Sequence, residues 1–221
     1  MRVEIWSDVV CPWCYIGKRR FESALERFEH RDEVEVVWRA FELDPAAPVE
    51  REGGYTDRLS SKYGVPRAEA EAMVERMTRT GDDEGIDIRF DRARPGNTFD
   101  AHRLIHLGLE RGVQDAVKER LLAATFTEGR PIGRTETLVD LAVEAGLDED
   151  EARAVLAGDR FAAEVRAEEQ EARALGISGV PFFVVDRAYG VPGAQHPDVL
   201  LDVLRSLGPA RRDRAPRRRS G

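Results

Sequence analysis

Strand-like patterns occur only near the two ends of this 221-residue chain, and this division is the feature that most constrains its fold. Apolar and polar side chains alternate near both ends, whereas the stretch between them has the three-to-four-residue spacing typical of helices. The patterns predict strands at residues 3–6, 34–41, 180–186 and 189–191, and helices that include residues 21–28 and 197–207. The predicted order is therefore β-α-β, a long helical block, and then β-β-α.

The helical block contains recognisable signals for the start of several helices. Asn97 is a predicted N-cap, a further helix is expected over residues 113–128, and a last one over about residues 160–175. Asp148 and Glu151 have the spacing of a capping box. Each end of the chain is too small for a stable core, so we expect the two ends to join in one sheet with the block inserted between them. The predicted domains are residues 1–50 with 177–208, an inserted helical domain at 51–176, and a basic disordered tail at 209–221.

Charge and composition exclude several functional classes. The net charge is −8, and because the tail from Pro209 carries six arginines against Asp213, the body of the chain is more acidic still. An acidic body is poorly suited to nucleic acid, which is bound through clustered cations. We find neither an apolar run long enough for a membrane helix nor the apolar core of a signal peptide, so we expect a soluble, cytoplasmic protein with no membrane partner. No function is assigned to the tail.

The only two cysteines form a single C-x-x-C motif, Cys11-Pro12-Trp13-Cys14, directly after the first predicted strand. A thiolate at the start of a helix is stabilised by unpaired backbone N–H groups and by the helix dipole. Pro12 suits the first helical position because it has no N–H to leave unpaired. We therefore predict that Cys11 is the exposed nucleophile and Cys14 the more buried resolving thiol in disulfide exchange.

Two other interpretations of the cysteines compete with a redox role. They could be structural residues that happen to be neighbours, or they could be half of a Cys₂His₂ zinc site completed by His102 and His106. The wide separation of the two pairs and the proline after Cys11 weigh against zinc. We predict no metal site, and we expect helix-surface or interface roles for the two histidines.

The motifs together resemble the DsbA-like branch of the thioredoxin superfamily, and within it the FrnE-like dithiol-disulfide oxidoreductases. The resemblance covers about residues 1–207, and the segments that carry it are EIWSDVVCPWCYIGKRRFE, VVWRAFELDP, NTFDAHRL, GVPFFVVD and GVPGAQ. It implies an α/β thioredoxin fold with a large all-helical domain inserted between its halves. It also implies a cis peptide bond between Val180 and Pro181, beside the active-site helix, where Val180 could pair with a substrate chain. An ordinary trans proline starting an edge strand is the alternative.

The resemblance implies further site residues and one departure from the wider superfamily. Pro12, Trp13, Val180, Pro181, Asn97, His102 and Gln195 are the candidate substrate-binding residues, although the last three could equally be a helix cap, a helix-face histidine and a surface turn. Many thioredoxin-fold enzymes bury an acid beneath the resolving cysteine, at the position that is Ile5 here. The proton of Cys14 would then be relayed by Asp8, by Glu42 or by water.

The leading functional prediction is a cytosolic thiol-disulfide oxidoreductase or isomerase that acts on protein or small-molecule disulfides. No cofactor is required, and glutathione is left open as a redox partner. A glutathione-dependent isomerase or kappa-class transferase is the enzymatic alternative, although such relatives typically carry serine in place of Cys11. A chaperone or binding module is the non-enzymatic alternative. The sequence fixes neither the direction of electron flow nor the oligomeric state, and a dimer is compatible with it. Because the chain has no second dithiol, the redox partner must be external.

Overall fold

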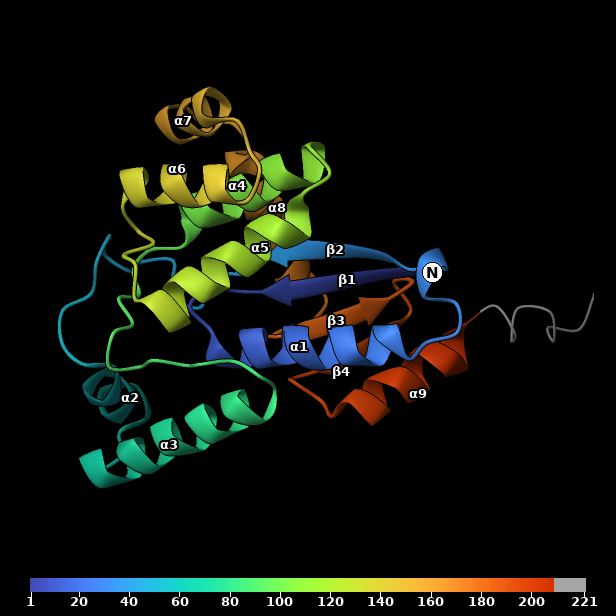
Figure 1. Ribbon diagram of the computed structural model, residues 1–221, viewed down its shortest axis with the longest axis horizontal. Coiled ribbons are helices and arrows are strands. Elements are labelled where there is room, and N and C mark those ends of the chain that lie inside the picture. Colours follow the sequence, from blue (N-terminus) through green and yellow to red (C-terminus); the bar gives the residue numbers. More distant parts are fainter. Residues whose placement is uncertain (209–221) are drawn as a thin grey trace, which may run out of the picture.

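The structure is a computed structural model in which residues 1–208 are described, and in that part of the chain the strands form one mixed sheet (Figure 1). The strand order is β2-β1-β3-β4, in which β1 is parallel to β2 and the other neighbours are antiparallel. The strands are β1 (Arg2–Ser7), β2 (Glu35–Ala40), β3 (Phe182–Val185) and β4 (Tyr189–Pro192). Both ends of the chain therefore contribute to the same sheet, as the sequence predicts.

The helices of the described part lie around this sheet, and one pair lies farther out (Figure 1). They are α1 (Pro12–Glu26), α2 (Tyr55–Tyr63), α3 (Arg67–Asp83), α4 (Phe99–Glu110), α5 (Gln114–Ala123), α6 (Thr135–Glu144), α7 (Glu149–Ala157), α8 (Ala162–Ala174) and α9 (Pro197–Leu207). Helices α1 and α9 lie side by side along one face of the sheet, whereas α4, α5 and α8 pack at the β2 side (Figure 1). Helices α2 to α8 all lie between β2 and β3 in the sequence, so they form the insertion.

The central strand β1 is buried on both faces, which explains its apolar residues on both sides. Val3 and Ile5 belong to a buried cluster with Phe21 of α1 and Leu204 of α9. Trp6 points to the opposite face, in a cluster with residues at the end of α8, and its indole N–H donates to the Glu168 carbonyl over 3.1 Å. Successive side chains of a strand alternate between faces, so this short strand anchors both helix layers.

The fold class predicted from the sequence is confirmed: the chain has a thioredoxin fold with a helical insertion. Two helices begin or end at residues other than those predicted, because the backbone there departs from a regular α-helix. The helix expected over 113–128 continues after α5 as a π-helical turn, Ala124–Glu128, and the helix expected from residue 160 begins at Ala162 because Phe161 is left-handed, with φ 65°. The predicted domain boundaries remain predictions, and the predicted tail lies outside the described residues. None of the helices described is long and apolar enough to span a membrane.

Candidate functional site

Both cysteines lie at the N-terminal end of α1, where the chain leaves the central strand β1. Cys11 is the N-cap residue of the helix and Pro12 occupies its first turn, so the proline begins the helix as the sequence predicts. The Cys14 N–H donates to the Cys11 carbonyl over 3.0 Å, which fixes the first turn. Cys11 is 5% exposed and Cys14 0% exposed. The predicted order of burial is correct, but the prediction of an exposed Cys11 is wrong because the loop before β3 covers it.

That loop contains Pro181, and the Val180–Pro181 peptide bond is cis. The Cys11 thiol donates to the Val180 carbonyl over 3.5 Å, so residues far apart in sequence meet at this sulfur. Gly17 of α1 permits the contact, because a Cβ atom at this position would lie 2.8 Å from Cγ of Pro181. The Pro181 carbonyl accepts a hydrogen bond from Gly193 over 2.8 Å, which ties the segment after β4 to the same loop.

A set of buried polar residues lies beneath the cysteines. Ser7 ends β1, and its carbonyl accepts a hydrogen bond from the Lys118 ammonium of α5 over 3.3 Å. Asp8 follows Ser7, accepts the Leu43 N–H over 2.8 Å, and lies 3.4 Å from Nε2 of His102. Burial alone would raise the pKa of Asp8, but the neighbouring His102, the Leu43 N–H and Lys118 together lower it. Asp8 is therefore held as a carboxylate under the dithiol.

The two thiols titrate as a pair. The hydrogen bond to Cys14 and then burial raise the pKa of Cys11 well above its ordinary value. Burial also acts to raise the pKa of Cys14, but the hydrogen bond from Cys11 and the positive charge of Lys118 outweigh it, and the pKa is lowered. The first ionisation of the reduced protein therefore belongs to the dithiol as a whole. The expectation that the helix start stabilises a thiolate on Cys11 remains a prediction.

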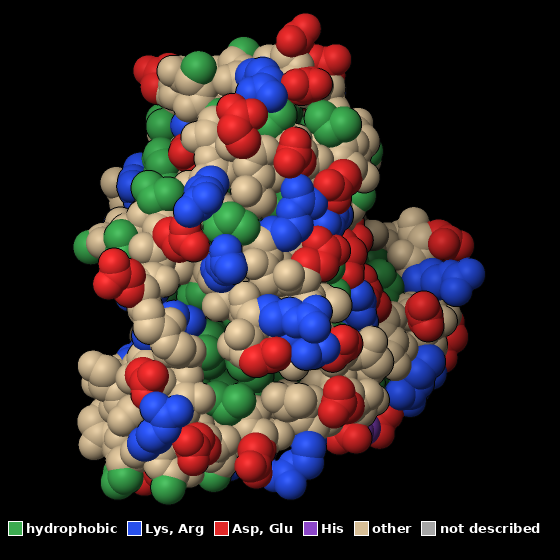
Figure 2. Space-filling view, turned by 60° about the vertical axis from the view of Figure 1, so that its left-hand side comes forward, with side chains coloured by type: hydrophobic (Ala, Val, Ile, Leu, Met, Phe, Trp, Pro, Cys, Tyr) green, Lys and Arg blue, Asp and Glu red, His purple; other side chains and the backbone are tan. Residues whose placement is uncertain are grey.

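Trp13 is the most exposed residue of the motif, at 37%, whereas Pro12 is buried. Leu43, whose N–H binds Asp8, is another large apolar residue that remains exposed. Figure 2 turns the left-hand side of Figure 1 forward and shows hydrophobic side chains gathered in a hollow among charged ones. The helix start is thus accompanied by exposed apolar surface that a substrate side chain could contact.

Asn97 and Gln195 each hold a loop in place. The Asn97 amide donates to the carbonyls of Pro45 and Ala47, at 3.3 Å each, and its oxygen accepts the Phe99 N–H over 2.9 Å. The N-cap residue of α4 is Thr98, so the predicted cap is displaced by one residue. The Gln195 amide donates to the Pro192 carbonyl over 2.7 Å, close to the Gly193 contact with the proline loop. Their predicted roles in substrate binding remain predictions.

The two histidines of α4 are buried, so of the expected helix-surface or interface roles the helix-surface role is wrong. His102 is 1% exposed and faces Asp8, whereas Nε2 of His106 lies 3.1 Å from a carboxylate oxygen of Glu168 on α8. Helix α4 packs against both β2 and α8, which leaves neither ring at the surface. Among the residues described, no group of three or more His, Cys, Asp or Glu side chains is arranged to hold a metal ion.

Asp8 and Glu42, the two side chains expected to relay the proton of Cys14, have different surroundings. Ile5 stands where many thioredoxin-fold enzymes have a buried acid, and here its side chain belongs to the buried apolar cluster. Asp8 acts electrostatically on Cys11, whereas Glu42 pairs with Arg166 and Glu169 of α8. The structure therefore places Asp8, but not Glu42, in the charge network of the dithiol.

Lys118 is the member of the site that sequence reasoning missed. Its side chain is fully buried against the Ser7 carbonyl and the indole ring of Trp38, whose centroid lies 5.6 Å from the ammonium nitrogen. One signal was present: Lys118 stands between the apolar residues Val117 and Leu121 in a chain that uses arginine for nearly all its cations. A lysine in such a position is normally read as a surface residue.

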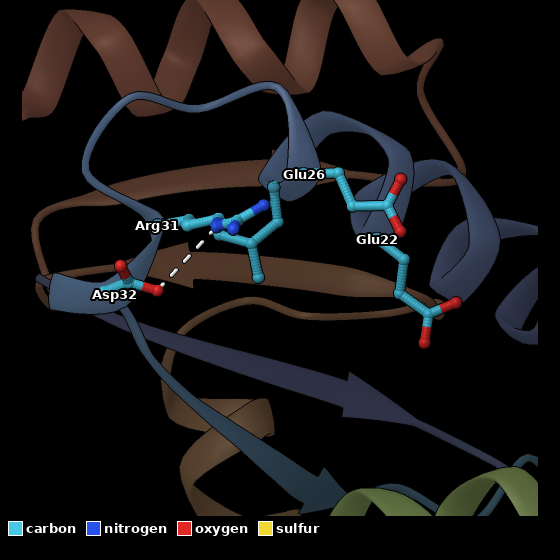
Figure 3. A pocket seen from close by; sticks show the side chains of 5 residues that line it. Glu22, Glu26, Arg31 and Asp32 are labelled. Atoms are coloured by element: carbon cyan, nitrogen blue, oxygen red, sulfur yellow. Dashed lines mark ion pairs between the residues drawn. The ribbon is translucent and has the colours of Figure 1, made fainter.

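A separate cavity of about 380 Å³ lies at the other end of α1, remote from the cysteines (Figure 3). Leu25 and four charged side chains line it, namely Glu22, Glu26, Arg31 and Asp32. It lacks a thiol and has no part in the site described above.

Comparisons with known proteins agree with this geometry. The model of the DSBA-like thioredoxin domain matches residues 2–205. The crystal structure of a probable DsbA oxidoreductase from Streptomyces coelicolor is 47% identical with a TM-score of 0.90, covering 99% of this chain and 93% of that one. The uncharacterised protein YwbO of Bacillus subtilis is 29% identical over 90% of this chain and 93% of its own length.

A more distant structure shares the fold. The cytosolic disulfide reductase DsbM from Pseudomonas aeruginosa, solved with GSH, has a TM-score of 0.66 at 18% identity, covering 93% of this chain and 98% of that one. The family match extends from the first strand to the last helix and includes the C-x-x-C helix and the cis-proline loop. The chain therefore belongs to the DSBA-like thioredoxin domain family.

Proposed function

We propose that Cys11 and Cys14 are the redox-active dithiol of a FrnE-like thiol-disulfide oxidoreductase, which acts through its C-P-W-C motif on protein or small-molecule thiols. The observation that carries the proposal is the contact of the Cys11 thiol with the Val180 carbonyl, over 3.5 Å, at the start of α1. A sulfur held between a helix N-terminus and a loop with an available backbone edge can meet a disulfide presented by a substrate.

Thiol-disulfide exchange chemistry gives the order of proton and electron movements. The Cys11 thiolate attacks a substrate disulfide, forms a mixed disulfide and releases one substrate thiolate. Cys14 then gives its proton to the released substrate thiolate and attacks the mixed disulfide, so that the Cys11–Cys14 bond forms and the second substrate thiolate leaves. The substrate is reduced by two electrons and the protein is oxidised. In the reverse direction the protein disulfide oxidises a substrate dithiol.

Glutathione is the redox partner we propose, in the cytoplasm. The chain contains only two cysteines, so a disulfide formed between them must be reduced by an external thiol. The fold neighbour DsbM is described as cytosolic and was solved with GSH, which supports this choice. The proposed exchange requires no metal or organic cofactor.

Substitution of each cysteine tests the proposal. The wild-type protein should catalyse insulin reduction in glutathione buffer, and Cys11→Ser should reduce the rate to that of the uncatalysed reaction because no sulfur can reach the substrate. Cys14→Ser should accumulate a mixed disulfide between Cys11 and glutathione, visible by mass spectrometry, because the resolving thiol is absent. Equal activity of Cys11→Ser and wild type would refute the redox function.

A further inference from the structure

The segment that follows β4, residues 193–195, belongs to the GVPGAQ motif, and the exchange chemistry above gives it no role. It lies against the proline loop, because the Gly193 N–H donates to the Pro181 carbonyl over 2.8 Å. It also lies against α1, because a Cβ atom at Gly17 would be 3.5 Å from the Cβ atom of Ala194 and 2.8 Å from Cγ of Pro181. Residues 193–195 thus support the proline loop.

Arg20 of α1 binds this segment directly. Its Nη1 group donates to the Ala194 carbonyl over 2.7 Å, and its Nε group donates to the Glu84 carboxylate over 2.6 Å. Glu84 is the C-cap residue of α3. The side chains of Arg20 and Glu84 are only 18% and 17% exposed, so the contact is largely shielded from water. Because a guanidinium group presents its N–H donors in a fixed planar fork, one arginine can join α1, α3 and the chain after β4.

Apolar packing accompanies these hydrogen bonds. Ala194 packs against a buried cluster that contains Tyr15 and Ile16 of α1 and Met77 of α3. In Figure 1 the end of α3 and the chain between β4 and α9 both lie close to α1. Hydrogen bonds in such surroundings are stronger than in water, and loss of a donor leaves its acceptor with an uncompensated cost of burial.

We propose that Arg20 is a positioning residue of the disulfide exchange, which holds residues 193–195 against the proline loop and thereby keeps the Val180 carbonyl at the Cys11 thiol. Arg20 binds the Ala194 carbonyl, and the residue before Ala194 binds the proline loop. That loop accepts the Cys11 thiol at the Val180 carbonyl over 3.5 Å. The proposal rests on the redox function proposed above, in which this backbone edge pairs with a substrate chain.

Release of the proline loop would have two opposite consequences. A peptide substrate loses the backbone edge with which it pairs, so its exchange becomes slower. The Cys11 thiol, which the loop covers, becomes more accessible to a small reagent that needs no such edge. Cys14 is completely buried, so it stays protected unless the protein unfolds. These readouts distinguish a displaced loop from a general loss of stability.

Arg20→Met removes the guanidinium group and keeps an apolar stem. With a disulfide-bonded peptide as substrate and glutathione as reductant, KM should rise about tenfold, the effect of losing one hydrogen bond from a charged donor, and kcat should change less. In the reduced protein, iodoacetamide should alkylate Cys11 faster than in wild type, whereas mass spectrometry should find Cys14 unmodified. Arg20→Lys should reverse part of both effects, because an ammonium group can still bind the Ala194 carbonyl but lacks the planar fork.

Arg19→Met is the matched control. Arg19 is the neighbouring arginine of α1, and its ion pairs go to Glu22 of α1 and Glu119 of α5. Its loss should lower stability and leave both KM and the alkylation rate of Cys11 unchanged. Wild-type values of both quantities in Arg20→Met, or equal changes in Arg19→Met, would overturn the proposal.

A measurement on the unmutated protein decides the question even if Arg20→Met does not fold. In the reduced protein, hydrogen exchange of the Gly193 amide and of the Arg20 Nε–H is compared with alkylation of Cys11 as urea is raised below the unfolding transition. One opening should release all three groups, so their opening free energies should be equal and should fall together. Openings of Arg20 and Gly193 that leave Cys11 protected would contradict the role assigned to Arg20. A protein that shows the shared opening but exchanges no disulfide would instead contradict the proposed function, because alkylation does not depend on catalysis.

Discussion

At the scale of single residues, the site depends on how closely the proline loop approaches helix α1. Pro181 packs directly over Gly17, and this contact brings the Val180 carbonyl to the Cys11 thiol. Pro181 can approach the helix this closely because Gly17 has no side chain. Glycine inside a helix is otherwise unfavourable by about 1 kcal/mol relative to alanine. Any Cβ atom at this position must displace the proline ring.

We predict that Gly17→Ala lowers both stability and the rate of disulfide exchange. The gain in helix propensity of about 1 kcal/mol is opposed by overpacking, which costs about 1–3 kcal/mol in a filled interior. The exchange rate should fall because the loop moves away from Cys11. Thermal unfolding and insulin reduction measure the two effects, with Gly158→Ala as control, since a Cβ there would meet only the Ala154 carbonyl at 3.4 Å. Wild-type exchange kinetics in Gly17→Ala would show that the contact does not position the loop.

The residues of the site differ in how far the sequence reveals them. Cys11 and Pro12 are recognisable because strand, cysteine and proline follow one another, and that order itself specifies a helix start. Lys118 could not be assigned, because its contact with the Ser7 carbonyl depends on how the insertion docks against β2. Local patterns carry no information about such docking, and a lysine among apolar residues of a helix is compatible with either surface or interior.

At the scale of secondary-structure elements, the end of β2 is joined to α8 by a charge cluster whose two carboxylates are buried. Glu42, two residues beyond the strand, and Glu169 of α8 both pair with Arg166. Burial, followed by the hydrogen bond with Glu169, raises the pKa of Glu42 to about 7 even with the arginine present. The cluster therefore holds a proton that the same carboxyl group would release in the unfolded chain.

This raised pKa predicts a pH-dependent stability. Between about pH 4.5 and pH 7 the folded protein binds more protons at Glu42 than the unfolded chain, so stability falls as pH rises through this window. Glu42→Gln, which cannot ionise, should gain about 1–3 kcal/mol over wild type at pH 8 and much less at pH 5. Urea unfolding at the two pH values measures the difference, and Glu164→Gln on the exposed side of α8 is the control. If the difference in unfolding free energy between Glu42→Gln and wild type is the same at both pH values, Glu42 does not hold a proton in the folded protein.

At the scale of the whole molecule, the inserted helices close the edge of the sheet. Strand β2 is an edge strand, and its outward backbone groups are bound by side chains of the insertion. The Trp38 N–H donates to the Gln114 amide oxygen over 3.0 Å, the Gln114 amide donates back to the Trp38 carbonyl over 2.9 Å, and the Ala40 N–H donates to Glu168 over 2.7 Å. An uncovered edge would expose unpaired groups to other chains. The insertion thus completes the sheet as well as supplying Lys118 and His102.

We accordingly predict that the sheet and the insertion unfold together and that Gln114 contributes strongly to this coupling. Gln114→Ala leaves the buried N–H and carbonyl of Trp38 without partners, at a cost of about 1–3 kcal/mol for each such group. The urea midpoint should therefore fall markedly, whereas Gln170→Ala on the exposed side of α8 should leave it unchanged. In the wild-type protein, tryptophan fluorescence and far-UV circular dichroism should report one coincident transition. Two separate wild-type transitions would show that the insertion is an independent domain, and an unchanged midpoint in Gln114→Ala would show that the edge contact does not couple it to the sheet.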